Sequence, residues 1–193
     1  IDGDKIIGIL ALGMKNAGTL KNDKVVTTVM SNIGFEKYLK ENNIDLLRAN
    51  VGDRNVLEMM QKEDVAIGGE QSGHIILRNY ATTGDGILSS LKLVEVIRDT
   101  GKDLHELVSA IKDAPQTLIN VKVDNAKKNT WDKNEKITSF IAEINKKHSD
   151  EVRILVRKSG TEPLIRVMTE GENKQLVHKL AEDIAKLIET ELN

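Results

Sequence analysis

The first apolar positions of the chain recur at helical spacing, and Gly18 is placed to end that helix at a C′ position. The positions concerned are Ile6, Ile7, Leu10, Ala11 and Met14. No apolar strand precedes this helix, so the sequence does not show which sheet it covers. The simplest interpretation is that the chain was cut from a longer protein.

From Lys24 onward, short apolar strands alternate with helices, which predicts βαβ units and a largely parallel sheet. The helix over residues 85–99 is expected to turn Ile87, Leu91, Val94 and Ile97 towards the core. A further helix begins at a capping-box pattern, Asp103 with Glu106. The expected strands are residues 24–30, 45–49, 65–67 and 74–77, and the expected earlier helices are 34–41 and 54–62.

The pattern changes at Pro115, which breaks the preceding helix and marks a domain boundary. Beyond it we expect a strand over 117–123, a helix over 135–147, two strands over 152–157 and 164–169 joined by a tight loop, and a last amphipathic helix from about Leu176 to Ile188. Two helices and a hairpin predict a small α+β domain with its helices on one face.

Composition narrows the class of protein. The 28 basic and 30 acidic residues give a net charge of −2, which argues against a nucleic-acid partner. The absence of cysteine excludes disulfides and thiolate metal sites and fits a reducing cytoplasm, where we place the protein. No apolar stretch approaches the roughly 20 residues of a membrane span, so no membrane association is expected.

The segment Arg157–Pro163 (RKSGTEP) lies in the tight loop between two expected strands, with Arg166 just beyond it. A phosphate dianion is held by converging backbone N–H groups at a glycine, by hydroxyl donors and by a guanidinium that grips two oxygens. The segment therefore predicts a phosphate-binding loop. A polar hairpin turn with a charged rim remains the alternative.

A second polar loop, Gly68–His74 (GGEQSGH), joins two expected strands. Its carboxylate, amide and hydroxyl groups can bind a polyol such as a sugar, and His74 can serve as a general acid or base near neutral pH. A flexible turn with a hydrogen-bonded histidine is the alternative.

Three weaker features have ordinary explanations as well. Asp53 and Arg54 follow a strand at the usual ligand-facing end of an α/β sheet, but a local ion pair or helix cap explains them equally. Residues 82–86 (TTGDG) resemble half of a dinucleotide fingerprint, which we reject because no strand precedes them and the third glycine is missing. Asp2 and Asp4 suggest a metal-binding pair, yet a turn and a helix cap account for both.

Together the two loops resemble the α-D-phosphohexomutase family, whose third domain carries a G-E-x-S-G-H sugar loop and whose fourth carries an R-x-S-G-T-E-P phosphate loop. Gln71, with VGDR and TTGDG nearby, is similar to the phosphoglucosamine mutase branch of that family. The resemblance covers essentially the whole chain. It implies that residues 1–22 are the tail of domain 2, residues 23–112 a three-layer α/β mixed-sheet domain 3, and residues 113–193 a TBP-like α+β domain 4.

The resemblance also implies a reaction, the interconversion of glucosamine 6-phosphate and glucosamine 1-phosphate through an active-site phosphoserine and a bisphosphorylated sugar. His74 would be a candidate for proton transfer. The implied phosphate ligands are Arg157, Ser159, Gly160, Thr161 and Arg166, and the implied sugar ligands are Glu70, Ser72, Gly73, Asp53 and Arg54.

The chain departs from the family in two places. The phosphoserine loop and the D-G-D-x-D-R magnesium loop have no counterpart, because residues 2–5 (DGDK) lack the third aspartate and the arginine. We therefore expect no metal site in this chain, and Mg²⁺ only in a full-length enzyme. The fragment should be inactive alone, and its expected partners are a hexosamine phosphate and the missing domains 1 and 2. A phosphoglucomutase/phosphomannomutase fragment and a non-catalytic sugar-phosphate-binding module remain alternatives.

Overall fold

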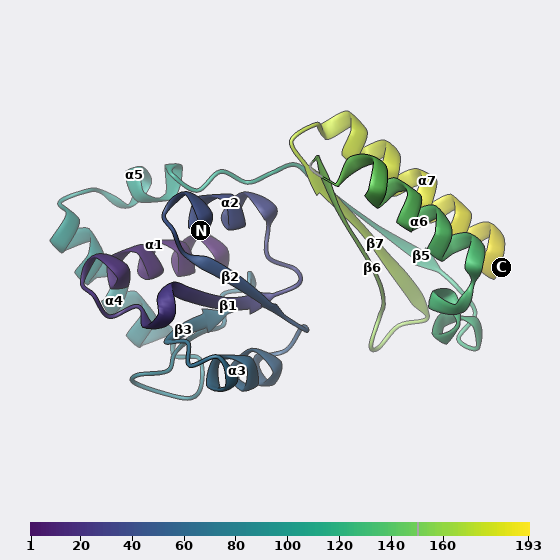
Figure 1. The fold of residues 1–193 in the computed structure, drawn as a ribbon. Helices are drawn as coiled ribbons and strands as arrows, with labels where there is room; N and C mark the ends of the chain where they lie inside the picture. Colours follow the sequence, from purple (N-terminus) through teal and green to yellow (C-terminus); the bar gives the residue numbers. More distant parts are fainter. Residues whose placement is uncertain (150) are drawn as a thin grey trace. The chain divides into compact units, whose positions relative to one another are not determined.

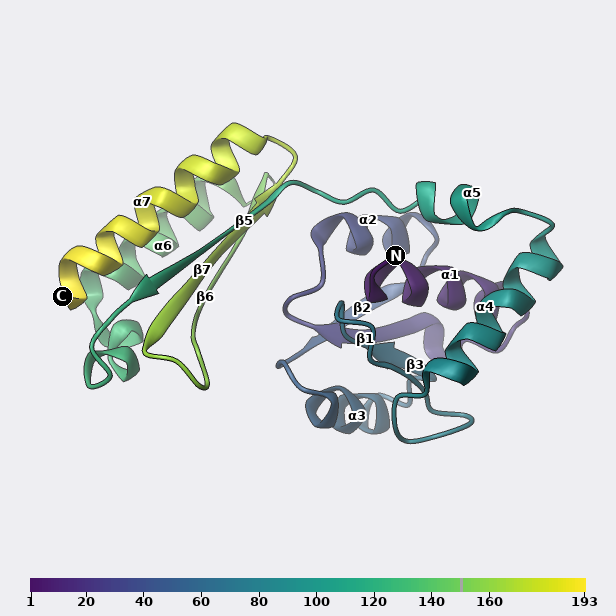
Figure 2. The ribbon, with the colours of Figure 1, turned by 180° about the vertical axis from the view of Figure 1, so that it is seen from behind.

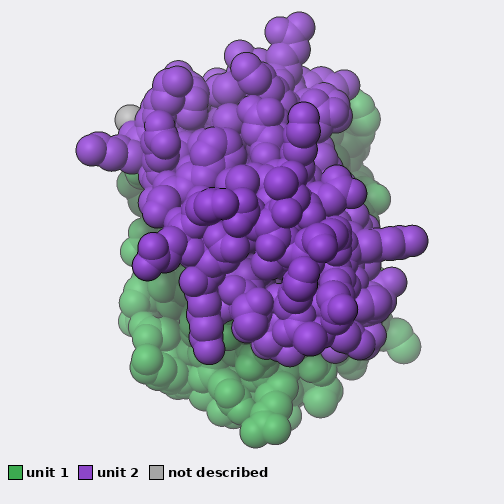
Figure 3. Space-filling view, turned by 90° about the vertical axis from the view of Figure 1, so that its right-hand side faces the viewer, with its two compact units in different colours: residues 1–113 green, residues 114–193 purple. Residues whose placement is uncertain are grey.

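The computed structural model describes residues 1–149 and 151–193 and divides the chain into two compact units, residues 1–113 and residues 114–193 (Figures 1 and 3). The two units are built on different sheets, which pair no strand with each other among the described residues. Each unit is therefore described by itself. The boundary lies one residue after Lys112, the last residue expected in the first of the two large domains.

Unit 1 is built on a mixed four-stranded sheet with the order β2-β1-β3-β4. The strands are β1 (Lys24–Thr28), β2 (Asp45–Ala49), β3 (Ile67–Gly69) and β4 (Ile75–Leu77). β1 pairs in parallel with both β2 and β3, and β4 runs antiparallel to β3. The carboxyl ends of β1, β2 and β3 consequently meet at one edge of the sheet, where ligands bind in open α/β sheets.

Helices cover both faces of this sheet, so that unit 1 has three layers (Figures 1 and 2). Alternation along β1 supplies both cores, because Val25 packs on one face and Val26 on the other. The larger core lies under α1 (Gly3–Asn16), α2 (Ile33–Glu41), α4 (Gly86–Thr100) and α5 (Leu104–Ser109), and the smaller core lies under α3 (Asp53–Lys62).

Residues 1–22 belong to unit 1, which corrects their assignment to the tail of a preceding domain. Ile7 and Leu10 of α1 are fully buried in the larger core, against strand residues such as Ile67. The sheet that α1 covers therefore follows the helix in the sequence. A helical pattern alone does not show whether the strands that the helix covers precede or follow it in the sequence. For this reason residues 1–22 were assigned to the preceding domain.

The inward face of α4 also differs from the prediction. Ile87, Leu91 and Val94 are 78%, 60% and 60% exposed. Leu88, Leu93 and Val96 pack on the core instead. Since α4 carries apolar residues on both sides, its helical period alone could not indicate which side is buried.

Unit 2 contains a three-stranded antiparallel sheet with the order β5-β7-β6 and two long helices on one face (Figures 1 and 2). Its core combines Ile165 and Val167 of the sheet with Ile137 and Ile184 of the helices. The elements are β5 (Gln116–Lys122), α6 (Glu135–His148), β6 (Val152–Lys158), β7 (Leu164–Gly171) and α7 (Lys174–Leu192), with short 3₁₀ turns at Lys127–Asn129 and Trp131–Lys133. The prediction of a mixed-sheet α/β domain followed by a smaller α+β domain is confirmed.

The predicted capping box is present, because Asp103 and Glu106 bind each other's backbone amides. Asp85 also caps a helix, accepting a hydrogen bond from the Leu88 amide. Gly18 has the positive φ of 68° that suits the residue after a helix. Across residues 1–149 and 151–193, no helix has the length and apolar character needed to cross a bilayer.

Candidate functional site

In unit 1 the candidate sugar loop is a tight turn at the ligand-facing edge of the sheet. The Glu70 amide donates to the His74 carbonyl at 2.9 Å, and the Gly73 amide donates to the Glu70 carbonyl at 3.0 Å. Gly73 adopts φ of +99°, which a side chain would strain. The turn is shorter than predicted, because Gly68 and Gly69 are part of β3.

Glu70 joins this turn to the loop that follows β2. Its Oε1 atom accepts a hydrogen bond from the Gly52 amide at 3.0 Å. Gly52 has φ of +117° and leads directly into α3. One carboxylate oxygen of Glu70 is therefore committed to the protein, and the other remains available to accept from a ligand hydroxyl.

His74 lies beside Asp53, with 3.8 Å between its Nε2 atom and Asp53 Oδ2. The Nε2 atom is buried and has no hydrogen-bond partner among the described residues. A small approach of Asp53 or of a ligand oxygen would supply that partner. The two residues therefore form a candidate pair for holding or moving a proton.

Arg54 and Ser72, the remaining predicted sugar ligands of unit 1, are both exposed. The Arg54 Nε donates to Glu58 at 2.8 Å along α3, and this hydrogen bond raises the pKa of Arg54 above its ordinary value. Its backbone amide donates to the Asp53 Oδ1 atom at 2.8 Å. Asp53 is the first residue of α3, after the N-cap Gly52, so this hydrogen bond is local and does not cap the helix.

In unit 2 the candidate phosphate loop is the connection between β6 and β7. The Ser159 amide donates to the Leu164 carbonyl at 2.9 Å, and Ser159 Oγ accepts from the Glu162 amide at 3.2 Å. Ser159 is 2% exposed, whereas Gly160 and Thr161 at the tip are exposed. The loop has a fixed base and an accessible tip.

Arg157 and Arg166 lie directly opposite each other on β6 and β7, on the face away from the helices. Arg166 donates to Glu162 at 3.2 Å, but its Nε atom is buried without a hydrogen-bond partner among the described residues. Arg157 has no hydrogen-bond or ion-pair partner within residues 1–149 and 151–193. Burial, followed by the proximity of Arg166, lowers the pKa of Arg157 from its ordinary value. Two adjacent guanidinium groups, only one of which is paired with a carboxylate, form a candidate site for an anion.

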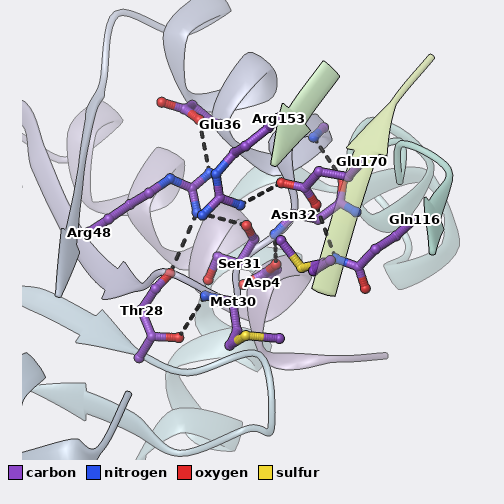
Figure 4. A network of polar contacts seen from close by, with 12 residues as sticks. Asp4, Thr28, Met30, Ser31, Asn32, Glu36, Arg48, Gln116, Arg153 and Glu170 are labelled. Carbon is purple, nitrogen blue, oxygen red and sulfur yellow. Dashed lines mark hydrogen bonds and ion pairs between the residues drawn. The ribbon is translucent and has the colours of Figure 1, made fainter. Parts of the chain in front are cut away.

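The loop after β1 is held by a separate set of contacts in unit 1. Arg48 of β2 donates to the Ser31 carbonyl at 2.7 Å and pairs with Glu36 at 2.8 Å (Figure 4). The Asn32 amide donates to Asp4 Oδ2 at 2.8 Å. The loop after β1 is therefore fixed by Arg48 and Glu36, which the sequence did not single out, and by Asp4, which it did.

No group of three or more acidic or histidine residues suited to a metal ion occurs among the described residues. Asp2 and Asp4 are both engaged within the protein, Asp2 as the N-cap of α1 and Asp4 with Asn32. Asp2 is a helix cap, as predicted, whereas Asp4 lies within α1 and holds a distant loop, which the interpretation as a turn did not include.

Comparison with known proteins identifies the family. A family model described as "Phosphoglucomutase/phosphomannomutase, alpha/beta/alpha domain III" matches residues 2–114. The chain belongs to this family. A second model, the C-terminal domain of phosphoglucomutase/phosphomannomutase, matches residues 118–187. The two matches correspond to units 1 and 2, and the first includes α1.

Curated relatives of this phosphohexomutase chain are named phosphoglucosamine mutase. The protein of *Fusobacterium nucleatum* is 88% identical over 193 residues, and those of *Clostridium botulinum* strain Kyoto and *Thermoanaerobacter* sp. strain X514 are 48% and 49% identical. Each match covers 100% of this chain and 43% of the relative. The chain thus spans less than half the length of the curated relatives it matches.

Solved structures support the fold. *Aspergillus fumigatus* N-acetylphosphoglucosamine mutase aligns with a TM-score of 0.81 at 19% identity, covering 98% of this chain and 43% of that one. A complex of that fungal enzyme with GlcNAc-6P and magnesium aligns with a TM-score of 0.79 at 20% identity, covering 97% and 46%. Identities this low establish the phosphohexomutase fold alone.

Proposed function

We propose that this chain is the sugar- and phosphate-recognising part of a phosphoglucosamine mutase, which interconverts glucosamine 6-phosphate and glucosamine 1-phosphate in the cytoplasm. Identity of 88% over the whole chain to a relative with that name supports the proposal. The chain spans 43% of that relative, so the catalytic cycle belongs to the longer protein.

The single observation that carries the proposal is the Arg157–Arg166 pair at the base of the loop that begins at Ser159. Arg157 and Arg166 are adjacent cations whose charge is only partly neutralised, so a bound dianion would stabilise them. A guanidinium group also binds phosphate oxygens in bidentate fashion. In the proposed site Arg157 and Arg166 provide charge, Ser159 and Thr161 provide hydroxyls, and the backbone at Gly160 provides an N–H donor.

Sugar recognition is assigned to the edge of unit 1. Glu70 would accept from a sugar hydroxyl with the oxygen that Gly52 leaves free, and Ser72, Gly73, Asp53 and Arg54 would provide further contacts to the sugar. His74 holds or moves a proton at Nε2 when the sugar oxygen reacts. The remote phosphate contacts would orient the sugar for in-line transfer.

The proposed cycle uses a phosphoserine that donates its phosphoryl group to form a bisphosphorylated sugar and then recovers the other phosphate. Mg²⁺ in the full-length protein would neutralise charge on the transferring phosphoryl group. This chain holds neither group by any residue described here, and we expect no turnover from it alone. Its role is to hold the same sugar in two orientations.

Substrate preference tests the proposal against its nearest alternative. The full-length protein should turn over glucosamine 6-phosphate with a kcat/KM at least about 10-fold above that for glucose 6-phosphate or mannose 6-phosphate, a difference of roughly 1.4 kcal/mol. A preference for the neutral hexose phosphates would instead assign the chain to a phosphoglucomutase/phosphomannomutase. Lack of turnover of all three by the full-length protein would support a non-catalytic binding module.

A further inference from the structure

The first turn of α1 is packed directly onto the candidate sugar loop. The Gly3 amide donates to the Gln71 carbonyl at 2.8 Å. Asp2 caps the helix through Oδ1, which accepts from the Lys5 amide at 3.1 Å, while its Oδ2 accepts from the Gln71 side-chain amide at 3.4 Å. Residues 2–4 are separated from this loop by more than sixty positions in the sequence.

Gly3 has no space for a side chain. A Cβ atom there would lie 2.9 Å from the Gly73 amide nitrogen and closer still to the Glu70 carbonyl oxygen. Both are backbone atoms, which cannot turn away as a flexible side chain would. The φ of Gly3 is not positive, so its backbone conformation does not call for glycine. Since glycine is also a poor helix former, the close packing on the loop accounts for its presence.

Gly86 shows what the same position looks like without such a contact. It is the first residue of α4 and follows the N-cap Asp85, as Gly3 follows the N-cap Asp2. A Cβ atom at Gly86 would meet no atom of residues 1–149 or 151–193 within 4 Å. The two glycines therefore form a matched pair that differs in the contact with the sugar loop.

Asp4 extends the same first turn to a second loop of the ligand-facing edge. It is 1% exposed, and its Oδ2 accepts from the Asn32 amide at 2.8 Å (Figure 4). Glu70 in turn binds the Gly52 amide of the third loop. The first turn of α1 is thus linked to the loops after β3 and β1 directly and to the loop after β2 through Glu70.

We propose that Gly3, together with Asp2 and Asp4, positions the sugar-binding loops of this chain. The proposal rests on the sugar-recognition role assigned above to Glu70, Ser72 and Gly73. Gly3 sets the distance between α1 and the turn, Asp2 holds Gln71, and Asp4 holds the loop that follows β1. None of the three contacts the sugar. They act through the loops that do.

The test compares Gly3→Ala with Gly86→Ala in the full-length protein. The added methyl group at residue 3 must displace the loop by about 1 Å, since non-bonded atoms need about 3.5 Å. A displacement of that size at a reacting centre costs about 100-fold in rate, so kcat/KM for glucosamine 6-phosphate should fall by about that factor. Gly86→Ala should retain the wild-type value. Equal kinetics for the two variants would overturn the proposal.

A second readout separates positioning from general destabilisation. Backbone amide NMR shifts of this chain should change over residues 70–74 in Gly3→Ala and not in Gly86→Ala, while inorganic phosphate should bind both with unchanged affinity. Weakened phosphate binding together with shifts throughout unit 1 would indicate general unfolding and contradict the proposal.

The proposal can still be tested if Gly3→Ala does not fold or if the proposed function is wrong. If Gly3→Ala does not fold, Asp2→Ser provides a second test, because serine retains a helix cap but is too short to reach Gln71. Asp2→Ser should lower kcat/KM several-fold at an unchanged Tm. The matched variant Asp85→Ser should leave kcat/KM unchanged. If the wild-type protein turns over no sugar phosphate, the proposed function fails. The localised shifts at residues 70–74 would then still support positioning, and their absence would refute it.

Discussion

The backbone of Gly84 lies against the imidazole ring of His74. A Cβ atom at residue 84 would come within 2.6 Å of the ring carbon Cε1 and 2.8 Å of Nε2. The ring therefore lies against the backbone of Gly84, with its Nε2 atom 3.8 Å from the Asp53 carboxylate. The position of the imidazole consequently depends on the absence of a side chain at residue 84.

Gly84→Ala should displace that ring and reduce catalysis by the full-length protein. We expect kcat to fall by about 100-fold, the lower end of the usual contribution of a general acid or base, with little change in KM. Steady-state kinetics with glucosamine 6-phosphate measure both constants. Gly86→Ala, two positions further on and in open space, is the control. A wild-type kcat for Gly84→Ala would contradict the role of His74.

Arg157→Met should weaken anion binding without destabilising unit 2. The variant removes a partly buried cation that lies opposite Arg166 and has no partner in the described part of the chain, so the folded state loses a repulsion. The bound anion loses a charged hydrogen bond of about 1.5–3 kcal/mol. Calorimetric titration with inorganic phosphate should show at least about 10-fold weaker binding, at an equal or higher Tm.

Lys179→Met is the matched control for this experiment, because it removes one exposed positive charge from α7 of the same unit. It should leave phosphate affinity nearly unchanged. Similar losses of affinity in the two variants would mean that net charge, and not the Arg157–Arg166 pair, attracts the anion.

Leu93→Ala and Leu91→Ala test which side of α4 is buried. Leu93 packs on the larger core, and Leu91 is 60% exposed. Loss of a packed leucine costs about 2 kcal/mol or more, whereas an exposed substitution stays within about 0.5 kcal/mol. Urea unfolding of the two variants gives both values. A larger loss for Leu91→Ala would restore the orientation predicted from the sequence.

Asp64→Asn should make stability less dependent on pH. The Arg78 guanidinium, and then the Lys21 ammonium, hold the pKa of the Asp64 carboxyl below its ordinary value of 3.8. A depressed folded-state pKa stabilises the protein above the unfolded-state value, and this contribution disappears as the pH falls through the folded-state value. The variant should therefore have a lower Tm than wild type at pH 7 and an equal Tm at about pH 2.

Asparagine suits this position because Asp64 has a positive φ of 50°. The substitution should not add backbone strain to the loss of charge. A Tm difference that persists unchanged at low pH would show that the ion pairs do not contribute.

The sequence predicted the structure best where a pattern of neighbouring residues was sufficient to define an element. The capping box at Asp103 and the hairpin around Ser159 depend on neighbouring residues, and each was predicted. The sequence was ambiguous where one pattern is compatible with two structures. Apolar residues on both sides of α4, for example, allow either side to be buried. The assignment of residues 1–22 failed for a related reason, because a helix does not indicate which sheet it covers.

Contacts between distant residues could not be predicted from a single sequence. Gly3 approaches Glu70, and Arg48 holds the carbonyl of Ser31, only because the sheet brings three loops to one edge. Gly84 lay within a segment that the sequence had singled out, but nothing in that segment pointed to His74. The residues assigned here to ligand binding remain predictions in both units.

Ligand titration of the 193-residue chain, followed by backbone amide NMR, tests the central claim most directly. Inorganic phosphate should shift resonances around residues 157–166, and glucosamine 6-phosphate should shift these and the resonances of residues 70–74, more strongly than glucose 6-phosphate does. This result would show that the chain recognises both the phosphate and the amino sugar. Shifts at neither loop with millimolar ligand would contradict the account, and shifts confined to residues outside both loops would place the binding site elsewhere.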